Sequence, residues 1–350
     1  MKKLISLLLC ATFLLSLAAC SQSPASESSA PGASEPAPVN EPKLTLSLGT
    51  TSAADDLQTK ALERFAENVS EKTGGNITIN VLPASQLGDA VTEMESMISG
   101  GQDMFCEAEL TYMYNYGVEA CAAENFGIVD TPEALAKFSA SDEANELREQ
   151  FRELNGIVTV GYNFYRQPIV MATQMPLATL EDFAGVKLRV VPSEATIASY
   201  EAIGFSPTSV AYSEVYLSLS QGVIEGTIAP LDAMYTMKFY EQAPYILKLG
   251  TAVTNVAVWM NEAKYSQLSD NQKQIIAECC AEAGDWYTQQ NTEVVNGYVA
   301  SMEAAGAVIA EPSDELVAQC SERWSELAKQ YEADGKLPAG SYDKLYNAGH

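Results

Sequence analysis

Histidine is almost absent from this sequence: the only one among 350 residues is the last, His350. A Ser-His-Asp triad, a Cys-His pair and an HExxH zinc site each need a histidine within the folded chain. The phosphate-binding patterns GxxxxGK[ST] and GxGxxG do not occur either. The sequence therefore argues against most common hydrolases, zinc enzymes and nucleotide-binding enzymes, and we expect neither a cofactor nor a metal ion.

Cysteine is scarce and lacks metal-binding spacing. Two of the seven cysteines, Cys10 and Cys20, precede residue 21, and the others form no CxxC pair. This pattern argues against a metal or redox centre and favours buried thiols that behave as small apolar side chains. A disulfide between Cys106 and Cys121 stays open at this stage.

Positive charge is in short supply. The chain has 20 Lys and Arg against 46 Asp and Glu, which gives a formal net charge of −26. Because phosphate backbones are bound by clustered lysines and arginines, we expect no nucleic-acid partner. An anionic ligand must instead be held by local positive side chains. The many carboxylates leave a hydrolase that uses paired carboxylates as an alternative.

The start of the chain has the features of an export signal. Two lysines precede an apolar run over 4–19, which is short for a membrane helix of about 20 residues. The tetrapeptide LAAC that ends at Cys20 resembles the lipobox of bacterial lipoproteins. We predict a signal peptide over 1–19, and a lipidated Cys20 that begins a disordered tether over 20–42. The protein would then be extracytoplasmic and lipid-anchored to the membrane; an ordinary signal peptide is the alternative.

From Lys43 onward, strand-like and helix-like segments alternate. Residues 43–48 and 77–81 alternate polar and apolar side chains, and apolar residues between them, over 57–69, keep helical spacing. This order predicts an α/β fold. Further helices are predicted over 131–154, 193–203 and 213–221, and further strands over 157–164, 186–191 and 251–260.

A long helix is predicted near the end of the chain. Residues Ser269 to Gln272 form a capping box, and helical spacing continues to about Ala305. The length from Lys43 onward exceeds that of one typical domain, so we expect two lobes. The long helix would span both of them.

Arg166 and Arg189 differ from the other arginines in their setting, because both lie at or near strand ends. Arg148 and Arg152, by contrast, lie one turn apart among glutamates, where ion pairs on a helix surface explain them. A guanidinium group holds a carboxylate through two hydrogen bonds, so Arg166 and Arg189 are candidates for an acid-binding site. The alternative is that each arginine pairs with an acidic residue and joins two segments.

Four phrases, in this order and spacing, resemble the DctP-type solute-binding proteins of tripartite ATP-independent periplasmic (TRAP) transporters. They are FAENV, TGG and QLG within 65–88, LEDFAGVKLRV at 180–190, SEVYLSLSQGVIEG at 213–226, and VWMN and LSDNQ within 258–272. The resemblance covers residues 43 to about 330. It implies two α/β lobes around a cleft, a long helix that spans both, and a membrane permease driven by an ion gradient.

The resemblance also implies where the lobes divide. Lobe I would comprise residues 43–163 plus about 252–293, and lobe II residues 164–251 plus about 294–350. In that family the arginine of the Lys-x-Arg-Val phrase holds the carboxylate of the ligand.

That arginine matches Arg189 here, and Arg166 is similar in placement to a second ligand arginine of many members. Phe164 and Tyr165, which precede Arg166, are candidates for an apolar wall. The protein is thus expected to bind a small mono- or dicarboxylate and to be no enzyme. The rivals are a binding protein of an ATP-driven importer, a carboxylate-based hydrolase and an extracellular sensor.

One departure from the family concerns Ala229. Many members have an asparagine there whose side chain contacts the ligand, and the alanine side chain forms no hydrogen bond. The departure favours a less polar acid, or else a polar contact from Glu107, Glu109 or Asp232.

Overall fold

The computed structural model describes residues 41–129, 131–250 and 252–350. The predicted signal peptide, Cys20 and nearly all of the predicted tether lie outside these residues. Within them, no helix combines the length and apolarity needed to cross a membrane.

Two β-sheets organise the described chain, and the first defines lobe I. Its strand order is β2-β1-β3-β10-β4. The strands are β1 (Leu44–Thr50), β2 (Ile77–Leu82), β3 (Met104–Ala108), β4 (Ile157–Tyr165) and β10 (Asn255–Asn261). Strand β1 is parallel to β2 and β3, whereas β10 is antiparallel to β3 and β4. The parallel strands are joined through helices, as such connections require.

The second sheet defines lobe II and has the order β11-β9-β5-β8-β6-β7. Its strands are β5 (Ile169–Thr173), β6 (Lys187–Val190), β7 (Ser206–Ser209), β8 (Gly226–Pro230), β9 (Tyr245–Leu247) and β11 (Val308–Ala310). Sequence reasoning did not predict β5, β7, β9 or β11, nor β3 of the first sheet, because strands of three to five residues carry too little alternation to detect.

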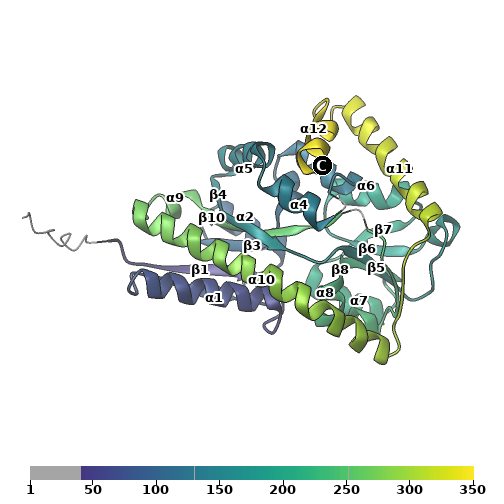
Figure 1. The fold of residues 1–350 in the computed structure, drawn as a ribbon, viewed down its shortest axis with the longest axis horizontal. Coiled ribbons are helices and arrows are strands. Elements are labelled where there is room, and N and C mark those ends of the chain that lie inside the picture. The colour runs from purple at the N-terminus through teal and green to yellow at the C-terminus, as the bar shows by residue number, and fades with distance from the viewer. Residues whose placement is uncertain (1–40, 130, 251) are drawn as a thin grey trace, which may run out of the picture. The chain divides into compact units, whose positions relative to one another are not determined.

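Helices cover the sheets on both sides (Figure 1). The α-helices are α1 (Leu57–Lys72), α2 (Ala90–Ile98), α3 (Glu109–Asn115), α4 (Pro132–Ser139), α5 (Asp142–Asn155), α6 (Glu194–Ala202), α7 (Val215–Ser220), α8 (Leu231–Thr236), α9 (Glu262–Tyr265), α10 (Asp270–Ala304), α11 (Asp314–Ala333) and α12 (Ser341–Gly349). The 3-10 helices are η1 (Glu119–Phe126), η2 (Leu180–Phe183), η3 (Tyr212–Glu214) and η4 (Phe239–Glu241).

The predicted helix over 131–154 is in fact two helices, α4 and α5. The backbone leaves the helical conformation at Ser141, which is extended, and the side chain of Ser141 accepts a hydrogen bond from the amide of Ala144 and caps α5. A serine N-cap satisfies an amide that the first turn leaves free, which favours a new helix start over continuation.

The long helix α10 confirms the prediction of one helix that spans both lobes. Ser269 and Gln272 form its capping box, and its 35 residues end at Ala304. It packs against α1 and β4 of lobe I and against α8 and β11 of lobe II (Figure 1). At 1.5 Å per residue it extends about 50 Å, long enough to serve both cores.

The chain crosses between the sheets twice before α10. It passes from β4 to β5 within residues 166–168, and it returns from β9 to β10 within 248–254. The predicted lobe boundaries fall near these two connections.

The C-terminal part differs from the predicted lobe division. Trp324 of α11 packs in the core of lobe II, whereas Tyr331 of the same helix and Leu345 of α12 belong to the apolar cluster around Phe126 in lobe I. Residues beyond about the middle of α11 therefore pack with lobe I. The prediction had assigned these residues to lobe II. The five cysteines of the described chain, including Cys106 and Cys121, are free and buried.

Candidate functional site

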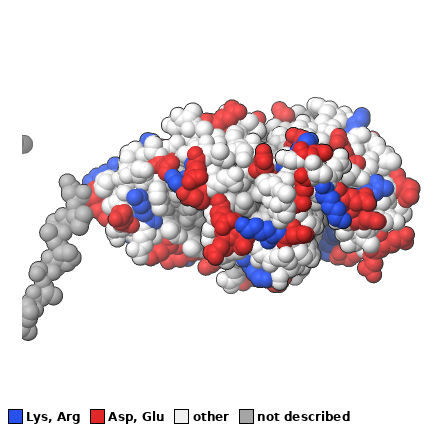
Figure 2. All heavy atoms as spheres, turned by 90° about the horizontal axis from the view of Figure 1, so that it is seen from above, with Lys and Arg blue, Asp and Glu red and all other residues white. Residues whose placement is uncertain are grey.

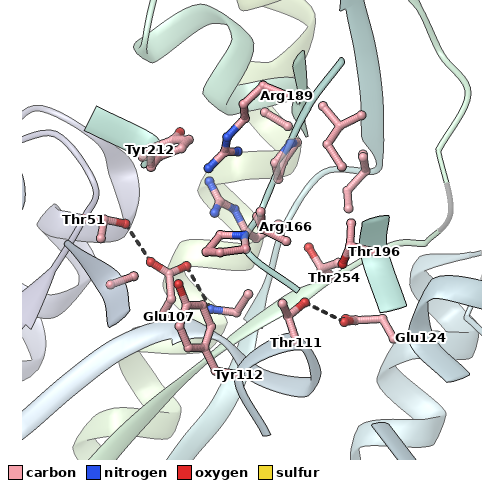
Figure 3. Close-up of a pocket in the computed structure, with 18 of the residues that line it drawn as sticks. Thr51, Glu107, Thr111, Tyr112, Glu124, Arg166, Arg189, Thr196, Tyr212 and Thr254 are labelled. Carbon is pink, nitrogen blue, oxygen red and sulfur yellow. Dashed lines mark hydrogen bonds between the residues drawn. The ribbon is translucent and has the colours of Figure 1, made fainter. Parts of the chain in front are cut away.

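A cavity lies between the two sheets, and both lobes contribute to its wall. It contains about 990 Å³ of space free of protein atoms, including the part open to solvent. Lobe I supplies residues of β3, α3 and η1, and lobe II supplies residues of β6, η3 and β8. Figure 3 shows that the guanidinium groups of Arg166 and Arg189 converge within it.

Arg189 is held in the wall by the second sheet. It lies on β6, between Thr208 of β7 and Thr227 of β8, and only 3% of its surface is exposed. Its Nε donates to the carbonyl oxygen of Val210 at 2.9 Å, and its guanidinium carbon lies 5.7 Å from the ring centroid of Tyr212. The ion pairs of the described residues include none to Arg189. Burial lowers the pKa of Arg189.

Arg166 lies in the first crossing, where its amide donates to the carbonyl oxygen of Thr254 at 2.9 Å. Its terminal nitrogen is 3.9 Å from Oδ2 of Asp232, and its Nε has no hydrogen-bond partner among the described residues. Burial is the largest single influence and lowers the pKa of Arg166, but the nearby acidic groups, Asp232 first among them, together outweigh it and raise this pKa. Arg166 is thus a partly neutralised cation, in contrast to Arg189.

Glu107 brings a carboxylate to the cavity from the end of β3. It accepts a hydrogen bond from Oγ1 of Thr51 at 2.6 Å and one from the amide of Ala108 at 3.0 Å (Figure 3). Ala229 lines the cavity on β8 and supplies only apolar surface there. Of the residues predicted from sequence, Arg189, Arg166 and Glu107 therefore share one cavity.

The other predicted residues do not line the cavity. Phe164 is fully buried in the core of lobe I, with its ring centroid 5.9 Å from that of Tyr287. Tyr165 points to the opposite face of β4, because successive strand residues alternate, and packs in another apolar cluster. Asp232 is buried beside Arg166, and its Oδ2 accepts a hydrogen bond from the hydroxyl of Tyr287 at 3.2 Å. Their contact with a ligand stays a prediction.

Glu109 forms a buried ion pair away from the cavity. Its Oε1 is 2.6 Å from Nε of Arg148, and its Oε2 accepts from Nδ2 of Asn255 at 2.7 Å. The guanidinium carbon of Arg148 lies 3.6 Å from the ring centroid of Tyr162. Arg148 is therefore buried, and its predicted place on a helix surface was wrong.

Sequence reasoning missed a polar group on the lobe I wall. Oε2 of Glu124 accepts from Oγ1 of Thr111 at 2.8 Å, and Oδ1 of Asn125 accepts from Oγ1 of Thr196, on lobe II, at 2.9 Å. All four residues line the cavity. Burial raises the pKa of Glu124 to about 7. The available signal was a polar pair inside the otherwise apolar stretch from Cys121 to Phe126.

Acidic side chains are spread over the surface outside the cavity. Figure 2 shows them across the face in view, with lysines and arginines among them. This distribution fits the net charge of −26. The background field therefore disfavours an anion, and local cations such as Arg189 have to outweigh it.

A family model matches most of the chain. The family described as DctP, bacterial extracellular solute-binding protein, family 7, matches residues 48–334. The chain is 28% identical over 258 residues to the sialic acid-binding periplasmic protein SiaP of Vibrio cholerae, which covers 72% of this chain and 79% of that protein. It is 26% identical to the C4-dicarboxylate-binding periplasmic protein DctP of Rhodobacter capsulatus, over 79% of this chain and 81% of that one.

Solved structures share the fold. A TRAP periplasmic solute binding protein from Ochrobacterium anthropi with bound L-fuconate superposes with a TM-score of 0.81 at 23% identity. The superposition covers 88% of this chain and 100% of that chain. The two-lobed α/β architecture is therefore shared.

Proposed function

The chain belongs to family 7 of the bacterial extracellular solute-binding proteins, the DctP family, and on that premise we propose that it captures a small organic acid between its lobes. The ligand carboxylate would pair with Arg189, and Arg166 would support it. The lobes would close on the ligand by rotation about the two crossing connections and α10.

The buried charge of Arg189, which forms no ion pair with any described residue, is the observation that carries the proposal. A guanidinium group that is 97% removed from solvent, with no acid paired to it among the described residues, is costly to bury. Nε of Arg189 already donates a hydrogen bond to the carbonyl oxygen of Val210, and this bond fixes the direction of the two terminal nitrogens. A carboxylate in the cavity would supply both the missing charge and the missing acceptors.

A thermal-shift screen of the purified chain tests the proposal. The panel would contain organic acids, sugar acids, neutral sugars and amino acids. A ligand at 100 times its dissociation constant stabilises the folded state by about 2.7 kcal/mol, which gives a readable shift. We expect shifts from carboxylates that Arg189→Ala removes and Arg323→Ala keeps, because Arg323 is exposed on α11 and donates to the carbonyl oxygen of Ala202.

Other results would contradict the proposal. Shifts confined to neutral sugars would exclude Arg189 as the anchor and would favour a binding protein of an ATP-driven importer. An Arg189→Ala variant that keeps the wild-type affinity for an acid would do the same. Chemical conversion of the acid during incubation, followed by mass spectrometry, would favour the carboxylate-based hydrolase over reversible binding.

We propose a TRAP permease as the membrane partner. Support comes from the family and from the related Ochrobacterium anthropi protein, which is described as a TRAP solute-binding protein. The test is uptake of the identified acid by cells that carry this protein and the permease encoded beside it. Uptake abolished by collapse of the ion gradients supports the proposal, whereas uptake that follows ATP alone contradicts it.

We also propose that Cys20 is lipidated, since the LAAC tetrapeptide resembles a lipobox. The membrane fraction should then hold the wild-type protein, and its mass should include the diacylglyceride. The Cys20→Ser variant should lose both properties. A wild-type protein released as a plain cleaved chain would favour an ordinary signal peptide.

A further inference from the structure

We propose that Asp56 forms a proton-dependent latch between the lobes: its neutral form holds the arrangement seen in this structure, and loss of its proton loosens that arrangement. The latch consists of Asp56 in lobe I and of Asp232 and Thr236 in lobe II, with Arg166 of the first crossing beside them. The inference goes beyond the proposed function, because it concerns the lobes of the free chain and needs no bound acid.

Asp56 joins the two lobes through its side chain. It lies directly before α1, and only 5% of its surface is exposed. Its Oδ2 accepts from Oγ1 of Thr236, on α8, at 2.9 Å, although the two residues are 180 positions apart. Its Oδ1 accepts from the amide of Gln58 at 2.8 Å and caps α1. The carboxyl group therefore lies where lobe I and lobe II meet.

Neither hydrogen bond requires a negative charge at Asp56. Asparagine and aspartate cap helices about equally well, and a neutral oxygen accepts from a threonine hydroxyl. A protonated Asp56 also keeps both bonds, because its carbonyl oxygen accepts from Gln58 while its hydroxyl group can accept from Thr236 or donate to it. Protonation therefore removes a buried charge without loss of the contact between the lobes.

The charges around Asp56 disfavour its ionised form. Asp232, one turn before Thr236 on α8, is 3% exposed, and its Oδ1 has no hydrogen-bond partner among the described residues. A terminal nitrogen of Arg166 lies 3.9 Å from Oδ2 of Asp232, whereas the ion pairs of the described residues include none to Asp56. Two buried carboxyl groups therefore lie near one guanidinium group that already pairs with Asp232.

The pKa of Asp56 reflects this setting. Burial raises it most, the negative charge of Asp232 raises it further, and the positive charge of Arg166 lowers it by less. The hydrogen bonds from Gln58 and Thr236 also lower it, yet the pKa stays above the ordinary value of 3.8. The arrangement in this structure thus favours a protonated Asp56.

The other titratable groups near Asp56 do not add charge at neutral pH, except for its exposed neighbour Asp55. They are tyrosines of η3 and α10, and burial raises the pKa of each above 10: Tyr212, Tyr287 and Tyr298. Separation of the lobes would expose Asp56 to water and move it away from Asp232. The separated lobes would then hold fewer protons, so a rise in pH favours them over the latched arrangement.

Small-angle scattering of the purified chain at pH 5 and pH 8 tests the latch. No ligand is added, and piperazine and Tris serve as buffers, because neither carries an anionic group that would enter the cavity beside Arg189. The ionic strength is the same at both pH values. We expect the radius of gyration of the wild type to rise from pH 5 to pH 8, since the ratio of latched to separated molecules should fall severalfold.

Asp56→Asn is the matched variant. Asparagine keeps the cap of α1 and an acceptor for Thr236 but carries no charge, so the radius should stay at the pH 5 value of the wild type at both pH values. Asp55→Asn is the control: it removes a charge from the exposed neighbour and should keep the wild-type rise. Asp232→Asn leaves Arg166 to pair with Asp56, so this variant should lose most of the rise. It keeps the test decisive if Asp56→Asn does not fold.

Several results would overturn the latch. A wild-type radius that is equal at the two pH values, or that falls as pH rises, removes its basis. A rise that persists in Asp56→Asn, or that Asp55→Asn abolishes equally, assigns the effect to another group. These results leave the proposed function standing, because that function is decided separately by the binding of carboxylates through Arg189.

Discussion

Single residues decide what the cavity can hold, and Arg189 shows how. Its Nε bond to Val210 and the ring of Tyr212 hold the side chain, and burial lowers its pKa. The buried guanidinium group is poorly solvated, and at such a site its attraction to a ligand carboxylate is stronger than in water. Arg166 has the same side chain but a different role, because Asp232 already compensates part of its charge.

Arg189→Lys tests whether the fork of the guanidinium group matters beyond its charge. A lysine keeps the charge but loses the planar pair of donors and the bond to Val210. We expect the affinity for the acid to fall by about 1.5–3 kcal/mol, as for one lost charge-assisted hydrogen bond. Calorimetric titration measures it, and Arg323→Lys is the control. Unchanged affinity in Arg189→Lys would mean that charge alone holds the ligand.

Glu124 links the cavity to the pH dependence of stability. Burial raises its pKa from 4.5 to about 7, and the negative charge of Glu109 adds to this rise. The hydrogen bond from Thr111 acts in the opposite direction. Glu109 itself forms an ion pair with Arg148 of α5. Between pH 4.5 and about pH 7, Glu124 is therefore more protonated in the native state than in the unfolded state. The contribution of Glu124 to the free energy of unfolding therefore falls as pH rises through this range.

The Glu124→Gln variant should lack this pH-dependent loss. Relative to the wild type, its free energy of unfolding should increase between pH 5 and pH 8 by up to about 3 kcal/mol. Urea denaturation at both pH values measures the difference. Glu119→Gln, at an exposed position of the same 3-10 helix, should show no such trend. A pH-independent difference for Glu124→Gln would show that Glu124 is ionised in the native state.

At the scale of elements, the Arg148–Glu109 pair joins α5 to α3. The side chains are 9% and 2% exposed, and Nε of Arg148 lies 2.6 Å from Oε1 of Glu109. The terminal nitrogen of Arg148 also donates to the carbonyl oxygen of Ser139, at the end of α4. The pair therefore fixes three helices behind the wall from which Glu107 and Glu124 project.

Arg148→Met should destabilise the fold strongly, because it leaves the charge of Glu109 buried and unpaired. We expect a loss of about 3–5 kcal/mol in the free energy of unfolding, measured by urea denaturation. Arg152→Ala, one turn further along α5, breaks exposed ion pairs with Glu149 and Glu262 and should cost less than about 1 kcal/mol. Equal losses in the two variants would contradict a structural role for the buried pair.

At the scale of the whole molecule, side chains connect the lobes beside the cavity. Oγ1 of Thr236, on α8 of lobe II, donates to Oδ2 of Asp56 at 2.9 Å, and Oδ1 of Asp56 caps α1 of lobe I. Thr196 and Asn125 form a second bond of this kind. Such contacts favour the arrangement of the lobes seen in this structure, and the proposed hinge motion would have to break them.

Thr236→Val should shift the lobes toward the open arrangement. The variant loses one bond between the lobes, so the closed population and the affinity for the acid should fall, the latter by about fivefold. Small-angle scattering without ligand should show a larger radius of gyration. Thr292→Val is the control, because its hydroxyl donates to Thr288 within α10. An unchanged radius and affinity would exclude a role for this bond in closure.

The helices and strands that the sequence alone predicted depend on local signals. The capping box of Ser269 and Gln272 and the alternation in 43–48 and 77–81 involve neighbours a few residues apart, and the structure shows the elements that they predict. The strand predicted over 186–191 likewise corresponds to β6, which carries Arg189. Chain length and the capping box predicted two lobes and one long helix, and the family resemblance implied the same architecture.

Only the tertiary structure decided which side chains share the cavity. Thr196 and Asn125 are 71 residues apart, and Arg148 and Glu109 are 39 apart, so no local pattern links either pair. The side chain of Phe164 packs in the core of lobe I, Glu124 and Asn125 line the cavity, and the second half of α11 packs against lobe I. Each outcome depends on which distant segments pack together, and packing depends on the burial of apolar surface over the whole chain rather than on spacing along it.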